Sequence, residues 1–308
     1  MRLIKRIVKY ILRRLPATSG FVNTRFDTVM DDIQRLHDSI NLRLQGIETK
    51  LQDNVLNSKN SLKLHEATQD EILSVLRLLA PKSAKEIRKG RFGGNYDGGY
   101  VMLDDFDGIS LAFSIGIADN DTWDLAMAAR GLLVHQFDHS IDRAPSKHER
   151  LRFHKEMVST KRGPGIETLQ SIFETYAHDL KGDVILKCDI EGEEWAALDA
   201  CPINELDRCA QIICELHSLE KLGDYPFLSL ANRVLNKLYG KFRVVHVHAN
   251  NWRGLVNLAN ICLPEVLEVT FANVRRYRFT DSHEIFPSSM DMPNLSGIPD
   301  IRLGTFVF

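Results

Sequence analysis

The sequence predicts an α/β domain built on a doubly wound, mostly parallel sheet. The chain has 308 residues and an ordinary apolar fraction of 44%, enough for one full-sized core and an appendage. From residue 109 onward, short apolar runs that are typical of buried strands alternate with segments of helical periodicity. Such alternation with short links is typical of parallel sheets that helices cover on both faces. Ligands of these sheets bind beyond the carboxyl ends of the strands, which is where we expect a site.

The domain predicted at residues 82–308 contains the following elements. Strands are expected at residues 109–117, 132–137, 152–158, 184–188, 210–215, 242–247, 266–271 and 303–308. Helices are expected at residues 121–130, 166–178, 193–200 and 227–239. The last two strands are expected to form an antiparallel pair. A glycine-rich run from Arg91 to Tyr100 precedes the first of these strands, and it forms either a hairpin turn or a loop over the mouth of the site.

Residues 1–16 have the pattern of a basic amphipathic helix. Residues 1–15 carry six Lys or Arg side chains and no acid, apolar residues recur every three or four positions, and Pro16 ends the pattern. A helix with one apolar and one cationic face binds the surface of an anionic membrane. The alternatives are a helix that packs on a partner protein and a targeting peptide. The chain has no apolar run long enough to span a bilayer, so we expect peripheral membrane attachment.

Residues 17–81 have the pattern of a coiled-coil stalk. Apolar residues step by three and four from Phe26 to Ile40, and a similar spacing resumes after a four-residue stutter. A mostly polar helix with a narrow apolar seam cannot bury that seam alone, so we expect a homo-oligomer. About 55 helical residues at a rise of ~1.5 Å would span roughly 80 Å. The alternative is a helical hairpin folded on the main domain, which the Asn- and Ser-rich break at residues 54–61 would permit.

Composition and cysteine usage limit the functional classes. The net charge of −2 argues against a nucleic-acid binder that relies on bulk positive charge. The five cysteines form no CxxC pair, and such usage suits a reducing compartment, with cysteine acting as a small hydrophobe. Together with the basic N-terminal segment, this pattern predicts a cytoplasmic protein that is peripherally associated with a membrane.

The first two strands of the alternating region are followed by residues suited to a nucleotide-like ligand. After the first comes a turn with Gly116, Ala118 and Asp121, where a ligand can approach the backbone and meet helix N–H groups. An ordinary strand–helix turn capped by Asp121 is the alternative. Asp138 follows the second strand about 20 residues later, where an acid holds a ribose diol in nucleotide-binding folds. Turn and acid together predict an adenosine-containing cofactor.

The buried strand at residues 184–188 runs into four acids. Glu193 and Glu194 fall in the first turn of the next helix, where the helix dipole favours negative charge. Asp189 lies directly on the strand end and Glu191 follows it, so a helix start does not explain these two. We therefore expect Asp189 to act in chemistry and Glu191 to support it.

Two later strands bring histidines to the same edge of the sheet. Glu215 and His217 alternate on one strand, and His246 and His248 alternate on the next, so each pair shares a face of its strand. Histidines and carboxylates at a cleft are the usual proton acceptors, and we expect a role as base or substrate contact. A divalent metal is the less favoured alternative, because the ligand types fit but no local signature such as HExxH occurs.

Several of these runs, in this order, resemble the FkbM-type and related methyltransferase-like family of S-adenosylmethionine-dependent methyltransferases. The run from Lys187 to Trp195 has the form lysine-x-aspartate-x-glutamate-glycine-x-glutamate, and a threonine-leucine pair precedes it. The runs at residues 114–124, 137–138 and 97–100 are similar to the methyltransferase-like branch. The resemblance covers roughly residues 88–280 and does not reach the stalk.

The resemblance implies a Rossmann-like class I methyltransferase fold, preceded by the N-terminal helical segment, with S-adenosyl-L-methionine as cofactor. By position, Gly116 and its neighbours would flank the methionine half, Asp138 would bind the ribose, and Asp189 would lie near the transferred methyl group. The residues expected at the cofactor are Asp97, Gly98, Ser114, Gly116, Ala118, Asp121, Asp138, Ser140 and Asp189. Those expected at the substrate are Glu191, Glu215 and Asn250. Those expected in catalysis are Asp189, His217, His246 and His248.

The chemistry of methyl transfer narrows the expected acceptor. Transfer from a sulfonium is an in-line displacement, so the protein must align an acceptor oxygen and remove its proton. Sugar hydroxyls are weak acids, which calls for a base or a metal. We expect O-methylation of a glycan or glycolipid hydroxyl, with membrane attachment placing the enzyme near lipid-linked saccharides.

Two other functional classes remain as alternatives. A non-catalytic, membrane-tethered coiled-coil scaffold would carry a degenerate methyltransferase-like binding domain. It is favoured by Ala118 and Ser114, which stand where the common first motif has a glycine and an acid. An NAD-dependent enzyme on the same sheet is weaker, because no GxGxxG follows the first strand.

Overall fold

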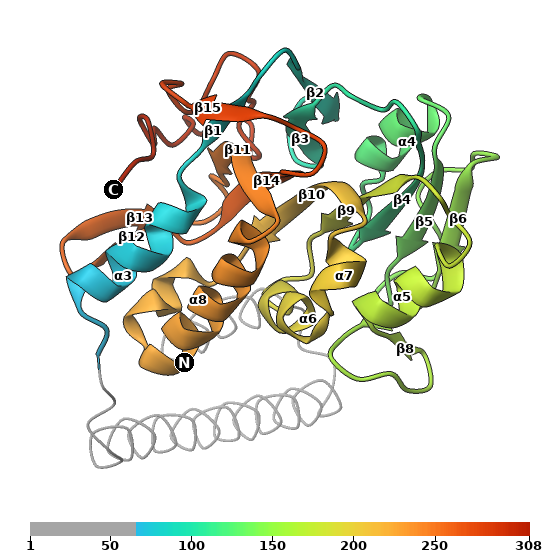
Figure 1. Cartoon of the computed structure of the whole chain (residues 1–308), viewed down its shortest axis with the longest axis horizontal. Helices are drawn as coiled ribbons and strands as arrows, with labels where there is room; N and C mark the ends of the chain where they lie inside the picture. The colour runs from blue at the N-terminus through green and yellow to red at the C-terminus, as the bar shows by residue number, and fades with distance from the viewer. Residues whose placement is uncertain (1–65) are drawn as a thin grey trace, which may run out of the picture. The chain divides into compact units, whose positions relative to one another are not determined.

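A seven-stranded sheet forms the centre of the described part of the chain (Figure 1). The computed structural model describes residues 66–308, so the predicted membrane-surface helix and the stalk up to residue 65 lie outside the described residues. Across the sheet the strands are β11 (Phe242–Ala249), β14 (Leu267–Asn273), β10 (Cys209–Leu216), β9 (Asp183–Cys188), β4 (Ile109–Ile115), β5 (Leu133–Phe137) and β6 (Leu151–His154). β14 runs antiparallel to both of its neighbours, and the other strands of this sheet run parallel. The predicted mostly parallel sheet with a late antiparallel strand is confirmed.

Two of the predicted strands differ from the structure. The run at residues 152–158 is divided between β6 and the short β7 (Met157–Val158), which pairs with β8 (Ile166–Glu167). Residues 303–308 form no strand, so the predicted antiparallel pair with residues 266–271 is wrong. β14 is hydrogen-bonded to β10 on one side and to β11 on the other, which leaves no free edge for a further partner. The C-terminal segment contributes a bridge between Phe286 and Gly304 instead.

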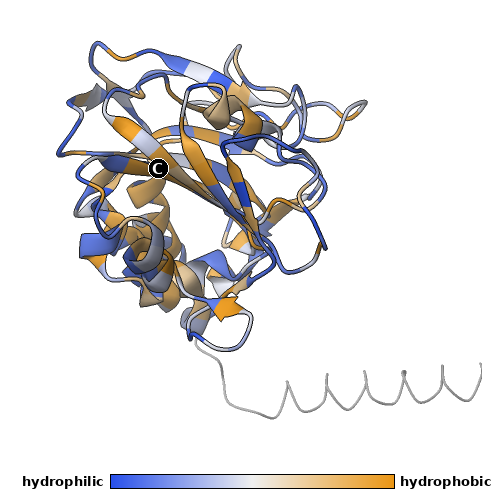
Figure 2. Cartoon of the chain, turned by 90° about the vertical axis from the view of Figure 1, so that its right-hand side faces the viewer, coloured by the Kyte–Doolittle hydropathy of each residue, from blue (hydrophilic) through white to orange (hydrophobic). Residues whose placement is uncertain are grey.

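Helices cover one face of the sheet, and a helix and a hairpin cover the other. The first face packs against α3 (Gln69–Leu76), α5 (Leu169–Tyr176), α6 (Glu194–Ala200), α7 (Ile203–Leu206) and α8 (Tyr225–Tyr239). The second face packs against α4 (Thr122–Ala128) and the hairpin of β2 (Lys89–Gly93) and β3 (Gly99–Leu103). Figure 2, in which apolar residues are orange, shows them concentrated in the strands of the sheet. Both faces are buried, which explains the nearly continuous apolar runs of these strands.

The remaining elements are short. β1 (Lys82–Ala84) pairs with β15 (Phe279–Asp281), and β12 (Leu255–Leu258) pairs with β13 (Ile261–Pro264). The 3₁₀ helices are η1 (Arg77–Leu79) and η2 (Leu219–Gly223).

Local sequence accounts for where the helices begin. The side chain of Thr168 accepts a hydrogen bond from the backbone N–H of Ser171, whose hydroxyl completes a capping box at the start of α5. α8 has Pro226 in its first turn, and its apolar residues recur at helical spacing on the buried face. α6 begins directly after Glu193, with Glu194 in its first turn, as the sequence predicts.

The domain begins before residue 82, which corrects the predicted boundary between stalk and domain. Ile72, Val75 and Leu76 of α3, with Leu79 of η1, are at most 1% exposed and belong to the largest core cluster. Burying each of these four side chains contributes about 1.5–3 kcal/mol to the stability of the folded domain. The apolar spacing of residues 72–79 therefore reflects burial in this domain, not the seam of a stalk.

All five cysteines are free thiols and four are buried, which agrees with their predicted use as small hydrophobes. Within residues 66–308, no helix has the length and apolar character needed to cross a membrane.

Candidate active site

Two adjoining cavities open at the carboxyl ends of the parallel strands. The first cavity, of about 480 Å³, is lined by residues that follow β4, β5 and β9 and by the segment around β7. The second cavity, of about 490 Å³, is lined mainly by residues at or just beyond the carboxyl ends of β9, β10 and β11. Both volumes fall in the range of about 300–1,000 Å³ that is typical of ligand sites. Asp97, Asp189 and Glu191 line both cavities, so the two spaces meet at three carboxylates.

The turn after β4 brings the backbone against the end of β9. Gly116 has a φ of +78°, and a Cβ atom there would lie 1.7 Å from the carbonyl oxygen of Asp189, so only glycine fits. Three other residues after strand ends are also left-handed: Ala118 (φ +44°), Glu191 (φ +55°) and Ser218 (φ +65°). Left-handed residues other than glycine cost about 1–3 kcal/mol each and gather at functional sites. The backbone of this sheet edge is therefore strained where the cavities lie.

Asp138 ties the turn after β4 to the end of β5. Its Oδ2 accepts hydrogen bonds from the backbone N–H groups of Ile117 (2.9 Å) and Ala118 (2.8 Å). Its Oδ1 accepts from the N–H (2.7 Å) and the hydroxyl (2.6 Å) of Ser140. Burial alone raises the pKa of Asp138, but these four hydrogen bonds outweigh burial and lower the pKa below its ordinary value. Asp138 lines the first cavity as a carboxylate whose acceptor positions the protein already fills.

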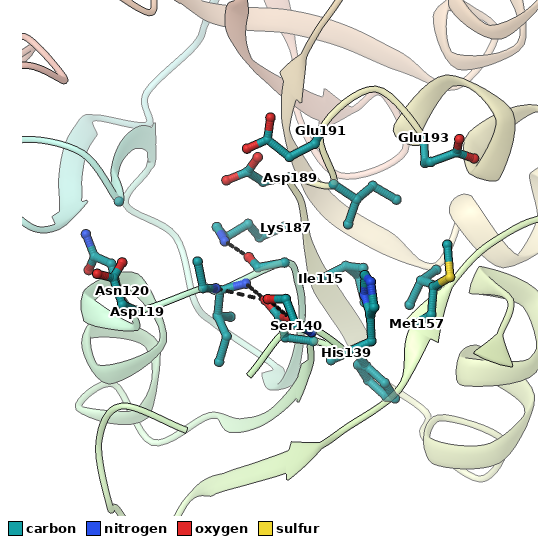
Figure 3. Close-up of a pocket in the computed structure, with 18 of the residues that line it drawn as sticks. Ile115, Asp119, Asn120, His139, Ser140, Met157, Lys187, Asp189, Glu191 and Glu193 are labelled. Carbon is teal, nitrogen blue, oxygen red and sulfur yellow. Dashed lines mark hydrogen bonds between the residues drawn. The ribbon is translucent and has the colours of Figure 1, made fainter. Parts of the chain in front are cut away.

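The first cavity has an apolar side and a charged side. Apolar contacts come from Phe137, Met157 and Val158, among others. Figure 3 shows Met157 on one side of the cavity and the neighbouring carboxylates of Asp189 and Glu191 on the other. A ligand with a flat apolar ring at one end and a cationic group at the other matches this distribution.

Asp189 lies where the cavities meet, with a buried lysine beside it. Burial raises the pKa of the Asp189 carboxyl to about 6, although the positive charges of Lys187 and His217 oppose the rise. Lys187 is 3% exposed and donates a hydrogen bond of 2.5 Å to the carbonyl oxygen of Gly116. This hydrogen bond, dashed in Figure 3, holds the ammonium group at the turn after β4.

Glu215 lies at the second cavity and is 4% exposed. The hydroxyl of Tyr100, on β3, lies 3.2 Å from Glu215 Oε1 and 3.4 Å from Asp189 Oδ2. Asn250 donates to Glu215 Oε2 at 3.3 Å. Burial, and then the negative charge of Asp189, raise the pKa of Glu215 well above its ordinary value. The carboxyl groups of Asp189 and Glu215 thus lie close together and share the hydroxyl of Tyr100 as a donor.

His217 presents one ring nitrogen to the second cavity. Its Nδ1 lies 3.3 Å from Glu194 Oε1 and 3.2 Å from the carbonyl oxygen of Glu215, so two acceptors face this nitrogen and fix a proton on it. Glu194 is fully buried and also accepts from the backbone N–H groups of His217 (2.8 Å) and Gly192 (2.9 Å). Burial alone lowers the pKa of His217, but the hydrogen bond and charge of Glu194 raise it overall.

Most of the residues predicted for the site line one of the two cavities. Of the predicted cofactor residues, the first cavity is lined by Asp97, Gly98, Gly116, Ala118, Asp138, Ser140 and Asp189. Of the predicted substrate and catalytic residues, the second cavity is lined by Asp189, Glu191, Glu215, His217 and Asn250. The glycine-rich run forms the β2–β3 hairpin, and its turn brings Asp97 and Gly98 to the edge of the first cavity.

Two predicted catalytic residues, His246 and His248, do not line either cavity, so the expected convergence of three histidines is wrong. His246 Nε2 lies 2.7 Å from Asp291 Oδ1. His248 lies 2.9 Å from Glu268 through Nδ1 and 3.1 Å from Asp300 through Nε2. The C-terminal segment thus contacts both rings, through Asp291 and Asp300.

Two predicted cofactor residues, Ser114 and Asp121, also lie outside the cavities. Ser114 is fully buried and follows Ala112 at period two on the face of β4 that packs against α4. Asp121 is 3% exposed, makes no cap with its side chain, and accepts hydrogen bonds from the N–H (2.9 Å) and hydroxyl (2.8 Å) of Ser146. Both assignments are wrong, because Ser114 packs inside the domain and Asp121 is hydrogen-bonded to Ser146, away from the cavities.

Several site residues were not predicted. Met157 and Val158 reach the first cavity because β7 breaks away from β6, a bend that the apolar pattern does not reveal. Trp252 and Arg253 line the second cavity from the loop after β11, and a Trp directly after two asparagines was the available sequence signal. Glu194 looked like a helix-start acid, and its contact with His217 depends on the crossover from β9 to β10.

Comparisons with known proteins find similarity in solved structures alone. No family model matches the chain, and no curated protein does. The chain is similar to a structure of the fibrillarin/Nop5p complex, with a TM-score of 0.33 and 10% identity over 61% of this chain and 93% of that chain. It is also similar to a variant of the 16S rRNA (adenine(1408)-N(1))-methyltransferase from Catenulisporales acidiphilia, with a TM-score of 0.28 and 15% identity over 60% of this chain and 97% of that one. At such scores the likeness carries no weight for the activity, and the case for an activity rests on the site.

Proposed function

We propose that the protein is an S-adenosylmethionine-dependent methyltransferase. The observation that carries the proposal is the pair of cavities that share Asp97, Asp189 and Glu191 at the carboxyl ends of the parallel strands. A group-transfer enzyme needs a donor and an acceptor held on either side of one reacting centre. Two cavities of similar size that meet at a single edge provide that arrangement.

The first cavity suits the cofactor. Its apolar side, with Phe137 and Met157, suits an adenine ring, and Asp138 and Ser140 lie next along the wall where a ribose would follow. The sulfonium of S-adenosylmethionine is positively charged, and the carboxylates of Asp189 and Glu191 favour a cation at the shared edge. The methyl group would then point from the first cavity into the second.

The second cavity suits a polar acceptor, and we propose a glycan or glycolipid hydroxyl. Carboxylate, imidazole and amide groups line it and offer hydrogen bonds to several hydroxyls. Trp252 is 61% exposed at this cavity, and an exposed indole is a suitable platform for the apolar face of a sugar ring. Arg253 beside it adds a positive charge that suits an acceptor with a phosphate or carboxylate.

In the proposed reaction, a lone pair of the acceptor oxygen forms a bond to the methyl carbon. The bond between that carbon and sulfur breaks, and its electron pair stays on sulfur, which becomes a neutral thioether. The hydroxyl proton leaves towards the group of side chains where the cavities meet, Asp189, Glu215 and His217, which we name the junction group. This removal makes the weakly acidic hydroxyl a competent nucleophile.

The proposal extends to the N-terminal part of the chain. The basic amphipathic pattern of residues 1–15 supports attachment to an anionic membrane from the cytoplasmic side, and the seam of residues 26–51 supports a homo-oligomer. The net charge of −2 gives no support to a nucleic-acid acceptor. Flotation of the full-length chain with anionic vesicles, compared with a chain lacking residues 1–15, tests the membrane attachment; equal flotation of the two would contradict it.

One observation favours a second candidate, a binding module without catalysis. Each oxygen of Asp138 already accepts two hydrogen bonds from the protein, so a ribose would have to share or displace them. Calorimetric titration of the full-length chain with S-adenosylmethionine tests both candidates. The methyltransferase predicts binding in the micromolar range with methyl transfer to a glycan acceptor. Binding without transfer to any acceptor would support the module, and absence of binding at millimolar cofactor would contradict the proposed function.

A further inference from the structure

The junction group has the composition and spacing of a metal site. Asp189, Glu215 and His217 each offer one ligand atom, and these atoms all lie within 4.8 Å of one another. Metal–ligand bonds of about 2.0–2.2 Å place two ligands of one ion at most about 4.4 Å apart. The group therefore reaches ligand geometry if its side chains move by a few tenths of an ångström. Asp189 directly follows β9, Glu215 lies at the end of β10 and His217 directly follows it. The pairing of these adjacent parallel strands holds the three backbones in register.

The orientation of His217 supports a cation at its Nε2 atom. The proton on Nδ1 is fixed by Glu194 and by a carbonyl oxygen, so the lone pair of the neutral ring lies on Nε2. Nε2 lies 3.7 Å from carboxylate oxygens of both Glu191 and Glu215, and it makes no hydrogen bond to residues 66–308. A lone pair that faces carboxylates is favourable only with a proton or a metal ion between them. A buried carboxylate on the other ring nitrogen is the usual support of a metal-ligating histidine.

The carboxylates of the junction group have few donors, and Asp138 shows the contrast within this molecule. Asp138 accepts four hydrogen bonds of 2.6–2.9 Å. Among residues 66–308, the Asp189 side chain has one hydrogen-bond donor, the Tyr100 hydroxyl at 3.4 Å. Glu215 shares that donor and also accepts from Asn250 at 3.3 Å. A buried carboxylate is unfavourable in its charged form unless donors or a cation compensate its charge. The second cavity gives an ion a route to these oxygens.

We propose that Asp189, Glu215 and His217 bind a divalent cation at the junction of the two cavities. Mixed carboxylate and imidazole ligands suit an ion such as Mn²⁺, and three protein ligands leave positions open towards the second cavity. The role of the ion rests on the proposed function, whereas its binding does not. With the ion bound, Asp189, Glu215 and His217 act as its ligands and not as the proton acceptor. A hydroxyl bound to the ion has a lowered pKa, so its proton leaves to water and the oxygen attacks the methyl carbon as an alkoxide. A six-coordinate ion with three protein ligands keeps up to three positions open, so it can bind an acceptor through two neighbouring oxygens, such as the vicinal diol of a sugar.

The binding is tested with Mn²⁺ and the full-length chain, after removal of metals with a chelator. Titration followed by electron paramagnetic resonance should show one tight Mn²⁺ site per chain. Glu215→Gln and His217→Gln should each weaken Mn²⁺ binding about 10–100-fold. Glu193→Gln is the matched control, because Glu193 lines the first cavity, is exposed and lies outside the junction group, and it should bind Mn²⁺ as the unchanged protein does. Equal affinity in all four proteins, or no tight site in the unchanged protein, would overturn the inference.

A second readout needs no variant and therefore does not depend on folding of the altered chains. Electron spin echo spectra of bound Mn²⁺ should show modulation from a directly coordinated imidazole nitrogen, and spectra without nitrogen modulation would contradict ligation by His217. Titration with S-adenosylmethionine separates this inference from the proposed function. Cofactor binding without a Mn²⁺ site overturns the cation and leaves the methyltransferase, whereas a Mn²⁺ site without cofactor binding overturns the methyltransferase and leaves the cation.

Discussion

The ends of β10 and β11 carry the same sequence pattern, but their histidines have different surroundings. Glu215 and His217 alternate at the end of β10, and His246 and His248 alternate at the end of β11. His217 presents Nε2 to the second cavity, whereas the imidazole rings of His246 and His248 pair with carboxylates of the C-terminal segment. Period-two spacing therefore predicts which face of a strand a side chain lies on. The segment that packs over that face determines whether the side chain lines a cavity or pairs with other residues.

The cover over β11 is the C-terminal segment. Asp291 and Asp300 lie 45 and 52 residues beyond the histidines that they contact, and Asn294 donates to Glu268 at 2.5 Å. At the end of β10, the partner of His217 is Glu194 of α6, which contacts Nδ1, and His217 lines the second cavity. We therefore expect His217, after β10, to act in the reaction, and His246 and His248, on β11, to stabilise the fold.

The largest expected effect is at Asp189. Asp189→Asn removes a negative charge from the edge where the cavities meet, and it should lower the turnover of methyl transfer about 10³-fold. The fold should persist, because the backbone N–H of residue 189, which donates to Ile115 at 2.9 Å, is unchanged. Single-turnover assays with labelled cofactor measure the loss, and circular dichroism checks the fold. Turnover within threefold of the unchanged protein would remove Asp189 from the chemistry.

The contrast between the two strands is tested most sharply by matched histidine variants. His248→Gln leaves Glu268 and Asp300 without their cation in a buried site and should cost about 3–5 kcal/mol of the free energy of unfolding. His217→Gln removes a ring that faces a cavity and should cost about 1 kcal/mol. Urea denaturation of both variants gives the two values. Similar losses would contradict the assignment of stability to β11 and chemistry to β10.

The same contrast predicts how stability depends on pH. Burial alone lowers the pKa of His248, but Glu268 and Asp300 raise it to about 10, above the value of about 6.5 in the unfolded chain. Because the folded state keeps a proton that the unfolded state releases, this contribution is complete below about pH 6.5 and is lost as the pH rises towards 10. Melting temperatures from pH 7 to 9.5 should fall more steeply in the unchanged protein than in His248→Gln. Parallel curves would show that His248 carries no such proton.

The smallest expected effect is at the acceptor. Trp252→Ala removes an exposed ring from the second cavity and should raise the KM for a glycan acceptor about 10-fold, with little change in kcat, since the ring contacts substrate in ground and transition states alike. The KM for S-adenosylmethionine is the internal control and should not change. A raised KM for the cofactor with an unchanged KM for the acceptor would contradict the assignment of Trp252 to the acceptor.

The sequence was sufficient for most of the parallel strands and for the site residues at their carboxyl ends. Gly116, Asp138, Asp189 and Glu215 each follow an apolar run directly, so strand ends located them without knowledge of contacts. Their neighbourhood follows from one rule, that the carboxyl ends of parallel strands meet at one edge.

What the sequence did not predict depends on packing between distant segments. The burial of His246 and His248 depends on acids in the last twenty residues, and no local pattern links them. Ser114 and Asp121 lie within a few residues of the turn that lines the first cavity, but strand alternation and the Ser146 loop direct their side chains elsewhere. The apolar spacing in α3 is the same for a stalk and for a helix packed on a domain, and the partner surface decides between the two.

The central claim is that a donor cavity and an acceptor cavity meet at Asp189. A crystal structure of the full-length chain with S-adenosylhomocysteine tests it most directly. The account predicts the adenine beside Phe137 and Met157 in the first cavity and the sulfur at the edge shared with the second cavity, next to Asp189. An empty first cavity at millimolar ligand, or a sulfur that points away from Asp189, would contradict it.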